Sequence, residues 1–123
     1  MRGVATLADL PNTIPIFPLA GALLLPRGRL PLNIFEPRYL AMTEDAIATP
    51  QRLIGMIQPT EAEAPDRPPA LYKVGCVGRI TAFSETDDGR YLITLAGICR
   101  FTIVDEIATT RGYRRVVPDF ARW

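Results

Sequence analysis

The 123-residue sequence has no histidine, a single lysine (Lys73) and a single serine (Ser84). Histidine is the most frequent general base and a common zinc ligand, so its absence argues against most catalytic and zinc-dependent designs. A Ser84–Lys73 dyad fails on geometry, because an odd separation on one predicted strand puts the two side chains on opposite faces. Asp87 and Asp88 precede a glycine and fit a turn better than a cation site.

Nucleotide-binding loops of the form GxxxxGK or GxGxxG are also missing from the sequence. Together with the lack of a credible nucleophile or base, this predicts that the chain is not an enzyme. It also predicts that no metal ion or cofactor takes part in its function.

Cysteine is scarce, and the two present, Cys76 and Cys99, show no CxxC or Cys/His spacing. This usage predicts two core thiols in a cytoplasmic protein rather than a disulfide. The longest apolar stretch, residues 14–25, is interrupted by Pro15 and Pro18 and falls short of the ~20 residues that a membrane span needs. No membrane association is expected.

Charge of one sign does not dominate, since fourteen basic and thirteen acidic residues give a net charge of +1. Long-range attraction to nucleic acid is therefore not expected. Local basic patches remain possible at Arg27 with Arg29, and at Arg111 with Arg114 and Arg115. RNA binding is accordingly kept as an alternative function.

The hydrophobic pattern indicates one mainly β domain, an α+β barrel with one or two helices. Prolines between Pro11 and Pro37 restrict the first third of the chain to short extended pieces, and "TDDGR" at residues 86–90 marks a hairpin turn. The predicted strands are Thr13–Pro18, Leu30–Phe35, Leu53–Ile57, Tyr72–Ser84, Tyr91–Ile103 and Tyr113–Phe120.

Glycines inside the two hairpin strands, Gly75, Gly78 and Gly97, predict bulges or bends that wrap the hairpin into a barrel. Period-two alternation gives each of these strands an apolar face. The expected inward sets are Tyr72, Val74, Cys76, Ile80 and Ala82 on the first strand, and Tyr91, Ile93, Leu95, Cys99, Phe101 and Ile103 on the second.

A helix of about three turns is predicted from Arg38, because apolar residues recur at helical spacing. Pro37 suits the first helical position, and Glu36 puts a negative charge at the positive end of the helix dipole. Glu36-Pro37-Arg38 is therefore interpreted as a structural strand-to-helix junction.

Residues 14–42, "IPIFPLAGALLLPRGRLPLNIFEPRYLAM", resemble the opening of the Lon N-terminal domain, the substrate-recognition part of the ATP-dependent protease Lon. "YKVGCVGRITAF" and "YLITLAGICRFTI" resemble two later strands of that domain, including its glycine and arginine at Gly97 and Arg100. The resemblance implies a PUA-like pseudo-barrel over residues 1–123. It also implies a non-catalytic module that recognises polypeptides, and the analogy with PUA domains gives an RNA-binding module as the alternative.

The family's ATPase and Ser-Lys protease regions have no counterpart in this sequence, so neither activity is transferred. The helical bundle that follows the barrel in the family is also missing, which we interpret as a truncation. An exposed apolar face is then expected, with self-association through Phe120, Trp123 and an unpaired edge at residues 113–117.

Exposed apolar polypeptide segments are the predicted partner, and strand addition at a sheet edge is a second physical route to the same end. The candidate binding residues share a large apolar side chain close to the proline-rich strands, although such residues are more often buried in a core. They are Leu23, Leu24, Leu25, Phe35 and Tyr39.

Overall fold

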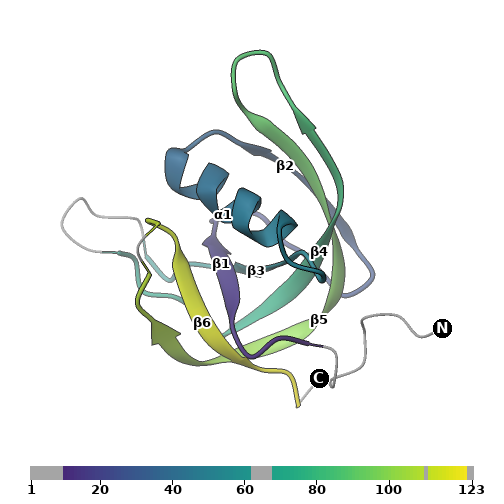
Figure 1. Cartoon of the computed structure of the whole chain (residues 1–123). Helices are drawn as coiled ribbons and strands as arrows, with labels where there is room; N and C mark the ends of the chain where they lie inside the picture. Colours follow the sequence, from purple (N-terminus) through teal and green to yellow (C-terminus); the bar gives the residue numbers. More distant parts are fainter. Residues whose placement is uncertain (1–9, 62–67, 110, 122–123) are drawn as a thin grey trace.

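The computed structural model describes residues 10–61, 68–109 and 111–121. The elements in chain order are β1 (Ile14–Pro18), β2 (Arg29–Ile34), α1 (Pro37–Ile47), β3 (Leu53–Ile57), β4 (Val74–Glu85), β5 (Tyr91–Ile107) and β6 (Arg114–Asp119) (Figure 1). The strands form one sheet in the order β2-β5-β4-β3-β1-β6, and an additional β5–β6 pairing closes all of them except β2 into a ring. This confirms the predicted mainly β pseudo-barrel.

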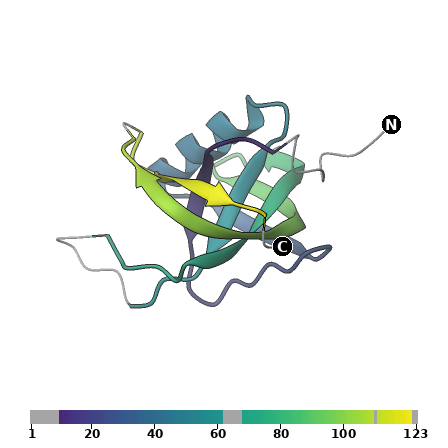
Figure 2. The same ribbon diagram turned by 90° about the horizontal axis from the view of Figure 1, so that it is seen from below.

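The 17-residue strand β5 makes this closure possible. Its first part pairs with β2 and β4, and its last part pairs with β6. The strand therefore curves around the molecule, as the view from below shows (Figure 2). Register shifts on β4 lie between Val77 and Gly78 and between Ile80 and Ala82, so one of the predicted bulges falls at Gly78.

Two hydrophobic clusters hold the fold together, one on each side of the central strands. The first lies between the sheet and α1 and includes Phe17, Ile34 and Met42. The second is made by the strands of the closed ring and is centred on residues such as Ile16 and Phe101. β3 is buried along its whole length, because its successive side chains enter the two clusters in turn.

The hairpin turn between β4 and β5 forms as predicted, with Thr86 N–H donating to the Arg90 carbonyl at 2.9 Å and Gly89 at φ +85°. The predicted inward face of β4 is partly wrong. Cys76 and Ile80 are buried, but Tyr72, Val74 and Ala82 are exposed. Tyr72 and Val74 lie just before and at the start of β4, and Ala82 lies toward the hairpin turn, so alternation alone does not bury residues at either end of the strand.

The two cysteines are both free, as expected. Cys76 lies opposite Arg100 on β5, whereas Cys99 lies opposite Val77, so the two thiols point to opposite faces of the sheet. Burial, together with the nearby Cys99, raises the pKa of Cys76 to about 11, which keeps this thiol protonated and unreactive at neutral pH.

The terminal strand β6 does not present the unpaired edge that was expected. It pairs with β1 on one side and with β5 on the other, and Tyr113, Val116 and Phe120 are buried. Trp123 lies outside the described residues. In the part of the chain that the structure describes, no helix is long and apolar enough to cross a membrane.

Candidate functional site

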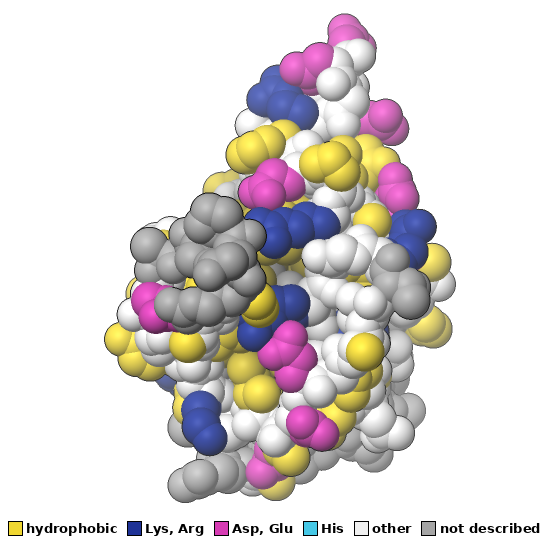
Figure 3. Space-filling view, turned by 90° about the vertical axis from the view of Figure 1, so that its left-hand side faces the viewer, with side chains coloured by type: hydrophobic (Ala, Val, Ile, Leu, Met, Phe, Trp, Pro, Cys, Tyr) yellow, Lys and Arg dark blue, Asp and Glu magenta, His cyan; other side chains and the backbone are white. Residues whose placement is uncertain are grey.

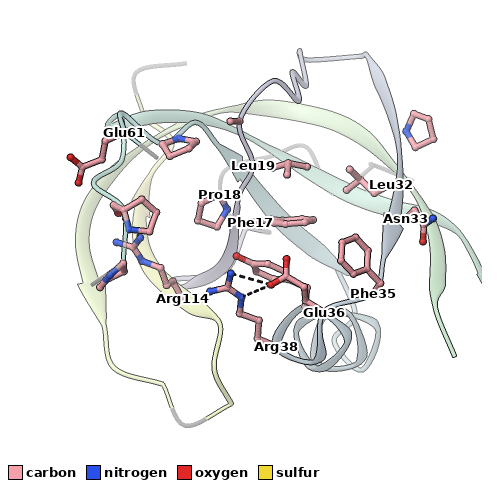
Figure 4. A pocket seen from close by; sticks show the side chains of 16 residues that line it. Phe17, Pro18, Leu19, Leu32, Asn33, Phe35, Glu36, Arg38, Glu61 and Arg114 are labelled. Carbon is pink, nitrogen blue, oxygen red and sulfur yellow. Dashed lines mark hydrogen bonds and ion pairs between the residues drawn. The ribbon is translucent and has the colours of Figure 1, made fainter. Parts of the chain in front are cut away.

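A groove of about 480 Å³ opens where the ends of β1 and β2 meet the first turn of α1 (Figure 4). Residues from the connection between β3 and β4 form its opposite wall. The lining is mainly apolar: Phe17, Pro18, Leu19, Ala20, Pro31, Leu32, Phe35, Tyr39, Pro59, Pro68 and Pro69, with Asn33, Glu36, Arg38, Glu61 and Arg114 as its polar members.

An aromatic pair forms part of this apolar lining. The rings of Phe17 and Tyr39 lie 4.2 Å apart between centroids, and both side chains are buried. Phe35 lines the same groove but is 64% exposed. The site therefore combines a buried pair of aromatic rings with one large apolar side chain, Phe35, that is exposed to a ligand.

The junction between β2 and α1 accounts for the exposure of Phe35. Ile34 ends β2 with a buried side chain, and the next residue of an extended chain points the other way. Glu36 is also extended, at φ −73° and ψ 138°, and its carbonyl accepts hydrogen bonds from the Tyr39 and Leu40 amides at 2.9 Å. Pro37 then begins the helix, as predicted.

The charged groups at this junction neutralise each other. Arg38 pairs with the Glu36 carboxylate at 3.1 Å, and its guanidinium lies 4.7 Å from the centre of the Tyr39 ring. The Glu36 side chain makes no capping hydrogen bond to the helix. Its contribution to stability therefore comes from the helix dipole and a half-exposed ion pair.

We expect Glu36→Ala to lower the free energy of unfolding by only about 0.5 kcal/mol, because exposed ion pairs and terminal charges are individually weak. Urea unfolding of the variant at low and high salt measures this, and the difference from the unmodified protein should shrink as salt is added. A loss above about 2 kcal/mol would show that Glu36 holds the junction in some other way.

Arg114 holds the opposite wall of the groove. It donates two hydrogen bonds to Glu106, at 2.7 and 2.8 Å, and a third to the Pro69 carbonyl at 2.8 Å. These bonds to Arg114 lower the pKa of the Glu106 carboxyl. On this side of the molecule, acidic and basic side chains lie beside one another among apolar ones, so the groove opens on a mixed surface (Figure 3).

A comparison with known protein families shows which family this chain belongs to. Residues 13–119 match the substrate-binding domain of the ATP-dependent protease La (LON). The chain belongs to the LON substrate-binding domain family.

Relatives of this LON domain include Lon protease 2 of Myxococcus xanthus, 32% identical over 84% of the chain, and Lon protease of Anaeromyxobacter dehalogenans, 32% identical over 79%. The matched part is 12% of each of those proteins. Two solved structures superpose over 88% of the chain. They are a Lon N-terminal domain protein from Xanthomonas campestris (TM-score 0.68, 26% identity, 59% of that chain) and the N-terminal domain of Mycobacterium avium complex Lon protease (TM-score 0.67, 17% identity, 54% of that chain).

The predicted binding residues of the LON domain fall into two separate places. Phe35 and Tyr39 line the groove, Phe35 exposed and Tyr39 buried. Leu23, Leu24 and Leu25 instead line a small cavity of about 80 Å³ next to β3 and β4. Leu24 is only 4% exposed and belongs to the cluster beneath α1.

Two residues carried over from the resemblance, Gly97 and Arg100, also lie away from the groove. A Cβ atom on Gly97 would lie 2.1 Å from the carbonyl oxygen of Leu25, so this glycine lets the turn before β2 approach β5. Arg100 is exposed and lines the small cavity with the three leucines.

The sequence prediction missed the groove residues Phe17, Leu19 and Leu32. Each lies on or beside a strand whose apolar residues were expected to fill the core, and Phe17 does so in part. The one sequence signal near these residues is Pro18, which ends the buried strand β1. The convergence of β1, β2 and α1 is a property of the tertiary fold.

One of the two predicted basic patches is largely neutralised in this LON domain. Arg111 pairs with Asp45 at 3.1 Å, and Arg114 pairs with Glu106. Arg115 donates a hydrogen bond to the Thr13 hydroxyl. These arginines therefore join β6 and its neighbouring loop to other elements, and two of the three have their positive charge paired with a carboxylate.

Proposed function

We propose that this domain is a non-catalytic polypeptide-binding module that holds exposed apolar segments of other proteins in the groove beside Phe35. The observation that carries this proposal is the combination of a cavity of about 480 Å³ with an aromatic side chain that is 64% exposed at its side. Grooves lined by apolar and aromatic side chains with a few polar groups are typical binding sites.

The charge arrangement supports an apolar ligand. Glu36 and Arg38 pair with each other, and Arg114 pairs with Glu106, so both arginines of the groove have their charge paired. Membership in a family named for substrate binding agrees with this role. Chemistry on the bound segment forms no part of the proposal.

The test is the affinity for a reduced and carboxymethylated protein that stays unfolded. We expect Phe35→Ala to weaken binding about tenfold, because a buried aromatic anchor commonly contributes more than 1 kcal/mol to an interface. Val104→Ala is the matched control, since Val104 is equally exposed, at 63%, but lies on β5 outside the groove. Leu23→Ala tests the second group of predicted residues.

Salt dependence separates this function from RNA binding. Polypeptide affinity should change less than about threefold between roughly 0.05 and 0.5 M salt, whereas binding to RNA falls steeply with salt. No measurable binding to the unfolded protein, an equal loss in Val104→Ala, or tight salt-sensitive binding to single-stranded RNA would each overturn the proposal.

A further inference from the structure

The outer edge of β2 has no partner strand. Among the strands that the structure describes, β2 stands at the end of the sheet order and pairs with β5 alone, whereas β6 is paired on both sides. No hydrogen bond from another described residue reaches the outer side of residues 29–34. An open edge of this kind can accept a further strand from another chain.

The register identifies which backbone groups face outward. Gly97 N–H donates to the Gly28 carbonyl at 2.8 Å, so the neighbouring pair Arg29–Ala96 is of the non-hydrogen-bonded type. Alternation then puts Pro31 and Asn33 in the same class. Pro31 agrees independently, because it has no N–H to give to β5. The edge therefore offers the N–H groups of Arg29 and Asn33 and the carbonyls of Arg29, Pro31 and Asn33.

Two cavities flank this edge and share the residues Pro31, Leu32 and Asn33. One is the groove beside Phe35. The other, of about 510 Å³, lies against the β4–β5 hairpin and includes Leu92, which is 43% exposed. Leu32 packs toward the cluster beneath α1, while Pro31 and Asn33 lie on the opposite face with their β5 partners Thr94 and Leu92.

We propose that the bound polypeptide adds to the sheet as an extended strand along the open edge of β2, with alternate side chains directed to the groove and to the second cavity. This inference rests on the proposed function and specifies the conformation of its ligand. The ligand residue opposite Leu32 faces the groove, and the residues opposite Pro31 and Asn33 face the hairpin side. The ligand is an apolar segment whose successive side chains enter the two cavities in turn.

Charge complementarity defines one end of this ligand. Arg27 and Arg29 are exposed at the start of β2, and within the described part of the chain neither forms an ion pair. At the other end of β2 lies Phe35, where the charged groups are already paired. The segment that fits is therefore apolar at its centre with an acidic residue at the end over Arg29.

Backbone hydrogen bonding gives the decisive experiment. The probe is a labelled peptide of about seven residues with apolar inner positions and glutamate at both ends, measured by fluorescence anisotropy. Asn33→Pro removes one outward N–H and leaves the ladder to β5 intact, so we expect about fivefold weaker binding. Asn33→Ala, which keeps the N–H, is the matched control. A peptide with lysine in place of glutamate should bind more weakly.

A test on the peptide avoids any question of folding. N-methylation of alternate residues blocks hydrogen bonds on one edge of a strand only, so one of the two methylated series should lose binding to the unmodified protein and the other should keep it. Equal binding of both series would show that no strand is added. If Phe35→Ala still weakens binding in that case, the groove stands without strand addition; if no peptide or unfolded protein binds, both proposals are wrong.

Discussion

Gly97→Ala is expected to lower the free energy of unfolding by about 3 kcal/mol, a large effect for one methyl group. The new Cβ would lie 2.1 Å from the Leu25 carbonyl oxygen, which belongs to the backbone and cannot turn away as a side chain could. The clash falls where Arg27 N–H donates to the Gly97 carbonyl and Gly97 N–H donates to Gly28. Either the turn at residues 25–28 moves away from β5, or β5 itself distorts at Gly97.

Gly89→Ala is the matched control. Gly89 has φ +85° and no atom within 4 Å of its would-be Cβ, so its replacement costs only backbone strain, about 1 kcal/mol. Chemical unfolding of both variants gives the comparison. A Gly97→Ala loss no greater than that of Gly89→Ala would mean that the turn is free to shift. Because the same turn leads into β2, we also expect Gly97→Ala to weaken peptide binding.

The fold could be predicted from local chemistry where that chemistry is strong. Pro37 marked the helix start, the glycine in residues 86–90 marked the hairpin turn, and β3 was predicted at its observed bounds. The ends of the long strands could not be predicted in this way: β5 runs on to Ile107, four residues past the predicted end, because it has β6 as a second partner there. Such pairing depends on distant parts of the chain.

The candidate site shows the same limit. Phe35 and Tyr39 were predicted as large apolar side chains close to the proline-rich strands, and the structure places both in one groove. The burial of Leu24 between two exposed neighbours depends on Gly78, since a Cβ there would lie 2.7 Å from the Leu24 side chain. Sequence alone identified that glycine as a bulge and did not reveal the side chain that packs over it.

Phe101→Ala is expected to destabilise the protein by about 4 kcal/mol, because Phe101 is fully buried within the cluster of the closed ring. Its ring also lies over two glycines. A Cβ on Gly55 would lie 2.9 Å from the ring, and a Cβ on Gly75 would lie 3.0 Å from it. Because Gly55 and Gly75 have no side chains, the ring of Phe101 can fill the space beside both strands.

A double-mutant cycle tests this packing directly. Gly55→Ala should cost about 2 kcal/mol alone and at least 1 kcal/mol less when combined with Phe101→Leu, whose shorter side chain vacates the contact. Gly75→Ala is the control, since its Cβ would also lie 2.3 Å from the Met56 carbonyl oxygen, which Phe101→Leu does not relieve. Urea unfolding of the singles and doubles decides it: strict additivity at Gly55 would mean that Ile14, whose side chain lies equally near at 2.9 Å, limits the space instead.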